Sequence, residues 1–165
     1  MNRINSLTFL LIFFCAIVPV APSRAVSGVH AGAPFPSDLF TVSDSSQNTG
    51  LRIDLPKPDC QIRRSDCEDI DLLNTLDGFN LLPRLSIPFD GAIDPASATS
   101  QTVFMISPDG RVTGINRIVW DPLTNTLHAE SDELLDQHSR YALIVTNGLR
   151  DAQGNAIEPS ETFQR

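Results

Sequence analysis

The chain has 165 residues and a formal net charge of −8, from 12 Lys and Arg against 20 Asp and Glu. A surface this acidic repels nucleic acid and anionic lipid, so neither is expected as a partner. The charge is typical of a protein that must stay in solution after export.

An apolar segment, Leu7–Val20, lies near the start of the chain and is broken at Pro19. It is too short for a membrane span, which needs about 20 apolar residues, and a small-x-small pattern, Ser23-Arg24-Ala25, follows it. Residues 1–25 are therefore predicted to be a secretory signal peptide. The alternative, an N-terminal anchor helix, is disfavoured because Pro19 and Pro22 disrupt the end of that helix. Cleavage leaves a formal charge of −10 and predicts a secreted, periplasmic or envelope protein without stable membrane insertion.

Residues 26–58 are expected to form an extended arm, because four prolines and the polar stretch Ser43–Gly50 prevent long regular helices. Leu51, Ile53 and Leu55 alternate with polar residues and predict a short strand. The arm, the cysteine loop after it and one helix make up a first region, residues 26–80.

Two cysteines, Cys60 and Cys67, remain after the predicted cleavage, with six residues between them. In an oxidising compartment such a pair closes a small loop, so a structural disulfide is the leading interpretation. A metal-binding or redox pair is the weaker alternative, because the spacing is not C-x-x-C and no histidine lies nearby.

The sequence Ser65-Asp66-Cys67-Glu68 has the form of a capping box, in which Ser65 and Glu68 bond each other's backbone N–H. A helix is therefore predicted over residues 66–76, with Gly78 as a left-handed stop. The acidic residues at its start also suggest calcium, but carboxylates placed around a helix do not converge on an ion. No metal ligand and no cofactor are assigned.

From residue 81 the hydrophobic period changes to two, which predicts strands. Leu85, Ile87 and Phe89 define the first strand, and Pro88 places it at a sheet edge. The later strands are predicted at Val103–Ile106, Val112–Trp120, Thr126–Glu130 and Tyr141–Thr146. Short strands separated by turn signals at such intervals predict an antiparallel β-sandwich over residues 81–165.

Two aromatic residues are given structural roles. Tyr141 opens a late strand after a crossing loop, where the hydroxyl of a tyrosine corner bonds the backbone a few residues upstream. Trp120 ends a middle strand and is expected to fill the core together with Phe89, Leu143 and Val145.

An ordered set of motifs runs through the second half of the chain. It consists of Ile93-Asp94-Pro95-Ala96-Ser97, Trp120-Asp121, Asn125-Thr126-Leu127, the strand-opening Tyr141 and Asp151-Ala152-Gln153-Gly154-Asn155. Residues 82–165 thereby resemble the bacterial Ig-like domain of the S-layer SbsA type. The resemblance implies that the last motif is a corner between strands, with Asp151 and Asn155 bonding the local main chain and Gly154 supplying the backbone conformation. A ligand site at this turn is the lesser alternative.

The upstream residues are similar to the N-terminal region of large secreted bacterial proteins related to virulence-factor lipases, in which an Ig-like segment precedes an α/β-hydrolase. This sequence departs from that pattern, because it stops at Arg165 and holds no G-x-S-x-G motif. The histidines His30, His128 and His138 lie beside no serine or cysteine motif and are interpreted as solvated residues.

Three functions follow as hypotheses. The first is a non-catalytic module, a spacer or interaction domain, that leads a secreted hydrolase or is a shortened relative of one. The second is a free-standing binding protein for an envelope polymer or a protein partner, using an open sheet edge. The third is a small hydrolase with paired carboxylates, drawn from Asp132, Glu133 and Asp136 or from Asp90 and Asp94. The first is preferred, and no catalytic residue is assigned.

Overall fold

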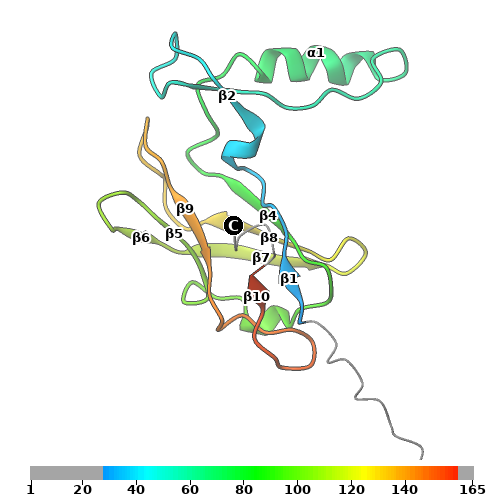
Figure 1. Cartoon of the computed structure of the whole chain (residues 1–165), viewed down its shortest axis with the longest axis vertical. Coiled ribbons are helices and arrows are strands. Elements are labelled where there is room, and N and C mark those ends of the chain that lie inside the picture. Colours follow the sequence, from blue (N-terminus) through cyan, green and yellow to red (C-terminus); the bar gives the residue numbers. More distant parts are fainter. Residues whose placement is uncertain (1–27, 160–165) are drawn as a thin grey trace, which may run out of the picture.

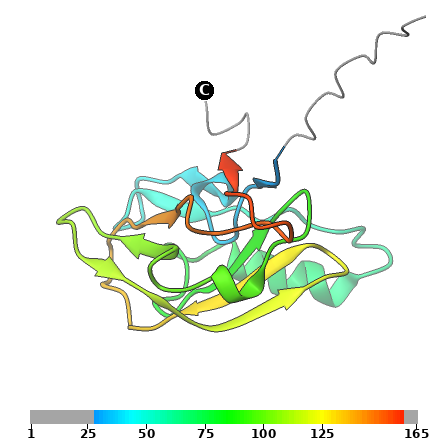
Figure 2. The same cartoon turned by 90° about the horizontal axis from the view of Figure 1, so that it is seen from below.

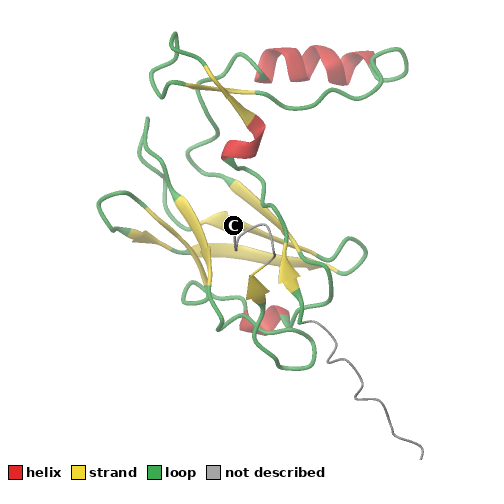
Figure 3. Cartoon of the chain, in the orientation of Figure 1, coloured by secondary structure: helices red, strands yellow, loops and turns green. Residues whose placement is uncertain are grey.

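The computed structural model describes residues 28–159, so the predicted signal peptide and residues 160–165 lie outside the described part of the chain. This part is mainly β, as the sequence predicts: two three-stranded antiparallel sheets face each other, and a smaller unit with the α-helix lies beyond one end of them (Figures 1 and 3). Viewed from below, the two sheets form successive layers (Figure 2).

The first sheet has the order β4-β8-β7, with β4 at Arg84–Pro88, β8 at Thr126–Ser131 and β7 at Ile115–Asp121. The second has the order β6-β5-β9, with β6 at Val112–Thr113, β5 at Val103–Ile106 and β9 at Ala142–Val145. In the first sheet, β4 lies at an edge, the position that Pro88 favours.

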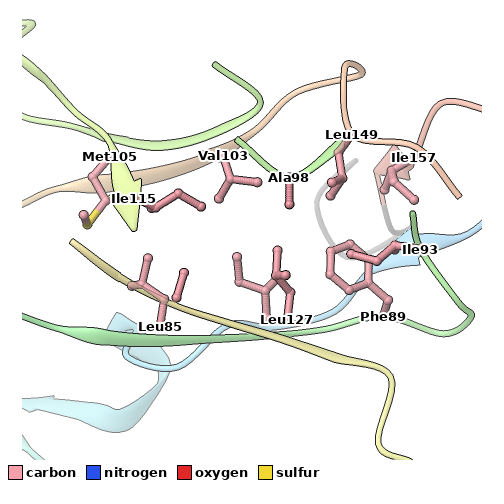
Figure 4. Close-up of a cluster of buried hydrophobic side chains, with 12 residues drawn as sticks. Leu85, Phe89, Ile93, Ala98, Val103, Met105, Ile115, Leu127, Leu149 and Ile157 are labelled. Carbon is pink, nitrogen blue, oxygen red and sulfur yellow. The ribbon is translucent and has the colours of Figure 1, made fainter. Parts of the chain in front are cut away.

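The core lies between the two sheets, and Figure 4 shows its side chains pointing toward one another. Its buried members are Leu85, Ile87, Phe89, Ile93, Ala98, Val103, Met105, Ile115, Leu127, Ala129, Leu149 and Ile157. Trp120, Leu143 and Val145 are half-buried and pack against this cluster, and the ring centroid of Trp120 lies 6.1 Å from that of Phe89. Each fully buried Leu, Ile or Phe contributes about 1.5–3 kcal/mol through lost contact with water.

The strand expected over residues 112–120 is divided at Gly114. Thr113 pairs with Met105 in one sheet, whereas Ile115 pairs with Ser131 in the other. A Cβ at Gly114 would lie 2.5 Å from the Oδ2 atom of Asp132, so the chain changes sheets where a larger residue does not fit. The prediction of one continuous strand was wrong because alternation of residues does not report a change of partner sheet.

Residues 28–36, expected as part of an extended arm, are instead paired with the sandwich. Strand β1, His30–Ala31, runs parallel to β10, Glu158–Pro159. Phe35 forms an antiparallel bridge with Ser86, and the two residues exchange backbone hydrogen bonds of 2.9 and 2.8 Å. The first described residues therefore extend the sandwich beyond strand β4.

A hairpin–helix unit, residues 37–79, follows. It contains a 3-10 helix η1 at Asp38–Phe40, the antiparallel strands β2 at Thr41–Ser43 and β3 at Leu51–Ile53, and the helix α1 at Arg64–Leu73. Cys60 and Cys67 form a disulfide with Cα atoms 5.7 Å apart, which ties the start of α1 to the preceding loop.

Helix α1 differs from its prediction at both ends. It begins at Arg64, and the side chain of the N-cap residue, Arg63, makes no capping hydrogen bond. The turn before the helix is closed by the N–H of Arg63, which donates to the carbonyl of Asp59 at 2.8 Å. The capping box was wrong: Ser65 lies inside the first turn and donates to Asp66 instead. At the other end, the side chain of Asn74 accepts from the N–H of Leu55 at 2.7 Å and donates to its carbonyl at 3.1 Å. The helix therefore ends before residue 76.

Candidate interaction surface

The D-x-x-G-N segment is a corner held by its own side chains and by the segment before η2: Asp151 bridges to Ile93, and the N–H of Ala152 donates to the carbonyl of Ala92 at 3.0 Å. Asp151 is only 3% exposed, and its Oδ1 atom accepts from the backbone N–H of Gln153 at 2.9 Å and of Asn155 at 2.8 Å. Its Oδ2 atom accepts from the side-chain amide of Asn155 at 2.9 Å. The Asn155 side chain, with the backbone donors, holds the pKa of Asp151 below its ordinary value, although burial opposes this. Gly154 has a φ of 85°, the region that favours glycine.

Tyr141 joins the crossing loop to the sandwich. Its hydroxyl accepts from the backbone N–H of Asp136 at 3.0 Å and from the guanidinium of Arg111 at 3.1 Å, and it donates to the Asp136 carboxylate at 3.2 Å. Arg111 also pairs with that carboxylate. The hydroxyl is thus shared between the loop and the segment after β5.

The three histidines bond to residues far away in the sequence and do not meet one another. Nδ1 of His30 lies 2.9 Å from Asp90, and its Nε2 lies 3.7 Å from Glu158. His128 projects from the outer face of β8, with its Nδ1 3.0 Å from the Ser86 hydroxyl. The interpretation of all three as merely solvated was therefore incomplete.

His138 has a different surrounding, at the hairpin–helix unit. Its Nε2 lies 3.9 Å from Asp77 and 3.5 Å from the side-chain amide of Asn48. Asp77 in turn accepts from the Thr49 hydroxyl at 2.5 Å, and this bond, with the backbone donors, lowers its pKa against the effect of burial. These contacts attach the crossing loop to the unit.

Three of the five carboxylates of the hydrolase hypothesis have separate partners. Asp136 binds Arg111, Asp90 binds His30, and Asp94 accepts from the N–H of Ala96 at 3.0 Å at the start of the 3-10 helix η2, Pro95–Ser97. Two open hollows on the surface are lined by the hairpin–helix unit, and neither includes these carboxylates. Within residues 28–159, no group of three or more His, Cys, Asp or Glu side chains is arranged to hold a metal ion.

The outer face of the sheet β4-β8-β7 is mainly polar, although the exposed Val119 also lies on it. Glu130, only 9% exposed, receives Arg84 at 3.1 Å on one carboxylate oxygen and Arg117 at 3.0 Å on the other. Arg117 lies at the bulge in β7 and has a φ of 48°. Because the three residues come from three different strands, no short sequence motif reports this ion triplet.

The outer face of the sheet β6-β5-β9 is apolar instead. Val103 and Met105 are buried in the core, so the alternate residues of β5, Phe104 and Ile106, face outward. Residues paired across strands share a face, and the outward partners are Ile144, Ala142 and Val112. These five residues form the apolar outer face, on which Val112 is 55% exposed. In a strand alternate residues face opposite sides, so residues 103–106 could have indicated this surface. All four residues are apolar, however, and the sequence therefore does not show which two of them face outward.

A family model for a bacterial Ig-like domain matches residues 72–164. The match includes both sheets and the apolar outer face, and it begins within the last turn of α1. No curated protein sequence matches the chain. Over residues 28–159, the structure holds no helix with the length and apolar character needed to cross a membrane.

Proposed function

The chain belongs to the bacterial Ig-like domain family, and from this premise we propose that it is a secreted module of the SbsA type that acts as a spacer or interaction domain. Domains of this family are generally not enzymes. In the proposal, residues 1–25 are removed on export, and the module either leads a secreted lipase-like or esterase-like hydrolase or is a shortened relative of such a protein. The similarity of the upstream residues to such proteins supports this context.

The apolar outer face carries the interaction part of the proposal. Five apolar side chains from three strands are contiguous through the strand register, with no charged residue among them. The other sheet presents Arg84, Glu130 and Arg117 on its outer face, as expected where a sheet meets water. The partner that fits is a neighbouring protein domain with an apolar patch, the hydrolase domain in the first version of the proposal.

The first experiment is an immunoblot of medium and envelope fractions from the source cells, with an antibody raised against residues 81–165. A band much larger than the 18.0 kDa of the full chain supports a module at the front of a longer protein. A band below that mass supports the shortened relative and directs the search toward separate partners. Retention of all the material at full precursor mass in the cytoplasm would contradict the secreted module in both forms.

The role of the apolar outer face is tested with Val112→Lys. The matched control is Val119→Lys, because Val119 is 58% exposed on the other sheet. If a hydrolase domain follows, Val112→Lys alone is expected to increase protease cleavage between the two domains. Equal cleavage in both variants rules out this face as the interdomain contact.

The free-standing envelope-binding protein is the second candidate, and the place of β9 at the end of its sheet, within residues 28–159, favours it. It predicts retention of the purified chain on envelope material, with loss of retention when residues 161–165 are deleted. Equal recovery with and without that material removes this candidate. Turnover of ester or glycoside substrates by purified protein would revive the hydrolase hypothesis.

A further inference from the structure

Two adjoining hollows on the hairpin–helix unit form one groove, the hairpin–helix groove. They meet at Asp54, Lys57 and Asn74, which line both of them. The first hollow continues to the apolar residues Leu39, Phe40, Leu55 and Pro56, and the second to the polar residues Gln47, Arg52, Asp71 and Thr75. Most of this lining precedes residue 72, where the match to the Ig-like family begins. The groove is therefore a feature of this chain that lies largely outside the matched family.

The backbone around the groove is fixed by hydrogen bonds within the unit. The N–H of Asp54 donates to the carbonyl of Phe40 at 2.8 Å, which joins the centre of the groove to its apolar end. The side chain of Asn74 bonds the N–H of Leu55 at 2.7 Å and its carbonyl at 3.1 Å. The groove is thus formed before any ligand binds, which lowers the entropy lost on binding.

The two cations that line the groove already have anionic partners. Nε of Arg52 lies 3.4 Å from Oδ2 of Asp44, and Lys57 pairs with Asp71. By contrast, Asp54 is exposed, and no other residue in the range 28–159 forms a hydrogen bond or an ion pair with its carboxylate. The centre of the groove therefore carries one negative charge that the chain itself does not compensate.

The apolar end of the groove is open to water. Leu39, on the 3-10 helix η1, is 74% exposed, and it lines the same hollow as Asp54. Covering a large apolar side chain is favourable in proportion to the area removed from water. An occupant that combines an apolar group with a cation therefore complements both features of this hollow.

We propose that the hairpin–helix groove binds a peptide segment of a partner protein in which Lys or Arg stands next to a large apolar residue. The cation pairs with Asp54, and the apolar side chain covers Leu39. The net charge of −8 favours the approach of a basic segment from a distance. This surface is separate from the apolar outer face, so the two can be tested independently.

Selection from a phage library of random hexapeptides on the purified chain tests the proposal without a prior choice of sequence. The enriched peptides are expected to carry Lys or Arg beside Leu, Ile or Phe. A synthetic copy of the most enriched peptide is then titrated into the chain by calorimetry. Enrichment of peptides that lack a cation, or a selection that enriches no peptide, would overturn the proposal.

Two pairs of variants locate the bound peptide. Asp54→Asn is expected to weaken its binding about two- to fivefold through loss of one exposed ion pair. Asp69→Asn makes the same change of net charge on α1, outside both hollows, and is expected to have much less effect. Leu39→Ala is expected to weaken binding about three- to tenfold. Its control, Leu72→Ala, alters a side chain that is 69% exposed and lines neither hollow.

Other occupants give different results in the same measurements. Equal affinity in Asp54→Asn, Leu39→Ala and their controls would place the peptide elsewhere and overturn the proposal. Val112→Lys is expected to bind the peptide nearly as well as wild type, and a large loss there would assign the peptide to the apolar outer face instead. A dimer in sedimentation that Asp54→Asn dissociates would identify a second copy of this chain, rather than a partner protein, as the occupant.

Discussion

Replacing Tyr141 by Phe removes one hydroxyl from the junction between the crossing loop and the sandwich. The backbone N–H of Asp136 then loses its acceptor at 3.0 Å, and the guanidinium of Arg111 loses one at 3.1 Å. A neutral hydrogen bond contributes about 1 kcal/mol and one to a charged group somewhat more, whereas the partial exposure of the site reduces both values. We expect a loss of about 1–2 kcal/mol in the free energy of unfolding.

Urea denaturation measures this loss. With a slope of about 2 kcal/mol per molar urea, the midpoint is expected to fall by about 0.5–1 M, at an unchanged slope. Ser139→Ala is a matched control, because it removes a hydroxyl from the same loop that makes one exposed hydrogen bond, at 3.2 Å to the carbonyl of Gln137. The control is expected to shift the midpoint by much less.

The contribution of Arg111 is separated by a double-mutant cycle. Arg111→Ala and Tyr141→Phe are expected to be non-additive, with a coupling of about 0.5–1 kcal/mol, because both act on the Asp136 carboxylate. An unchanged midpoint for Tyr141→Phe would refute the role given to its hydroxyl. Strict additivity would show that Arg111 and Tyr141 stabilise the loop independently.

Three further predictions concern the core, the change of sheets and the corner. Leu127→Ala is expected to lower the free energy of unfolding by about 2–5 kcal/mol, because Leu127 is 0% exposed and its removal leaves a cavity. Urea denaturation measures this loss. A loss below about 1 kcal/mol would contradict the place of Leu127 in the centre of the core. Gly114→Ala is expected to lower the free energy of unfolding by about 1–3 kcal/mol, because the new Cβ would displace Ser100. The Ser100 hydroxyl bonds both the N–H and the C=O of Ile115 at 3.0 Å. An unchanged melting temperature would show that the junction between β6 and β7 relaxes freely. The lowered pKa of Asp151 means that its stabilising effect is complete above the ordinary value of 3.8 and is lost as the pH falls through the folded-state value. The stability difference between wild type and Asp151→Asn should therefore shrink on acidification below 3.8, and a difference independent of pH would exclude ionisation of Asp151 as its cause.

The sandwich was predictable from the sequence because strand periodicity and turn chemistry are local. Leu85 and Ile87 alternate with polar residues, and a strand buried on one face must show such a pattern. The Asp151 corner is also local, since its donors lie at Gln153, Gly154 and Asn155. The Cys60–Cys67 disulfide was predictable for the same reason, because the two cysteines are only seven positions apart and can meet across one short loop.

Partner choice was left to the tertiary structure. Periodicity says that Thr113 and Ile115 are strand residues with the same orientation, but not that they pair in different sheets. The start of α1 was misplaced because Ser65, read as the N-cap, lies inside the first turn, directly after a turn in which the N–H of Arg63 bonds the carbonyl of Asp59. Both the division of the strand at Gly114 and the start of α1 thus depend on residues outside the short pattern from which each was predicted.

The candidate surface shows the same division. An apolar residue in a strand indicates burial against something, and the sequence of β5 offers one at all four positions. Only the packing of the two sheets decides that Val103 and Met105 fill the core, whereas Phe104 and Ile106 face outward. The ion triplet of Arg84, Glu130 and Arg117 likewise exists only after three strands align. Local backbone preference and alternation are properties of neighbouring residues, whereas a face, an edge or an ion pair between strands depends on which strands the whole chain brings together.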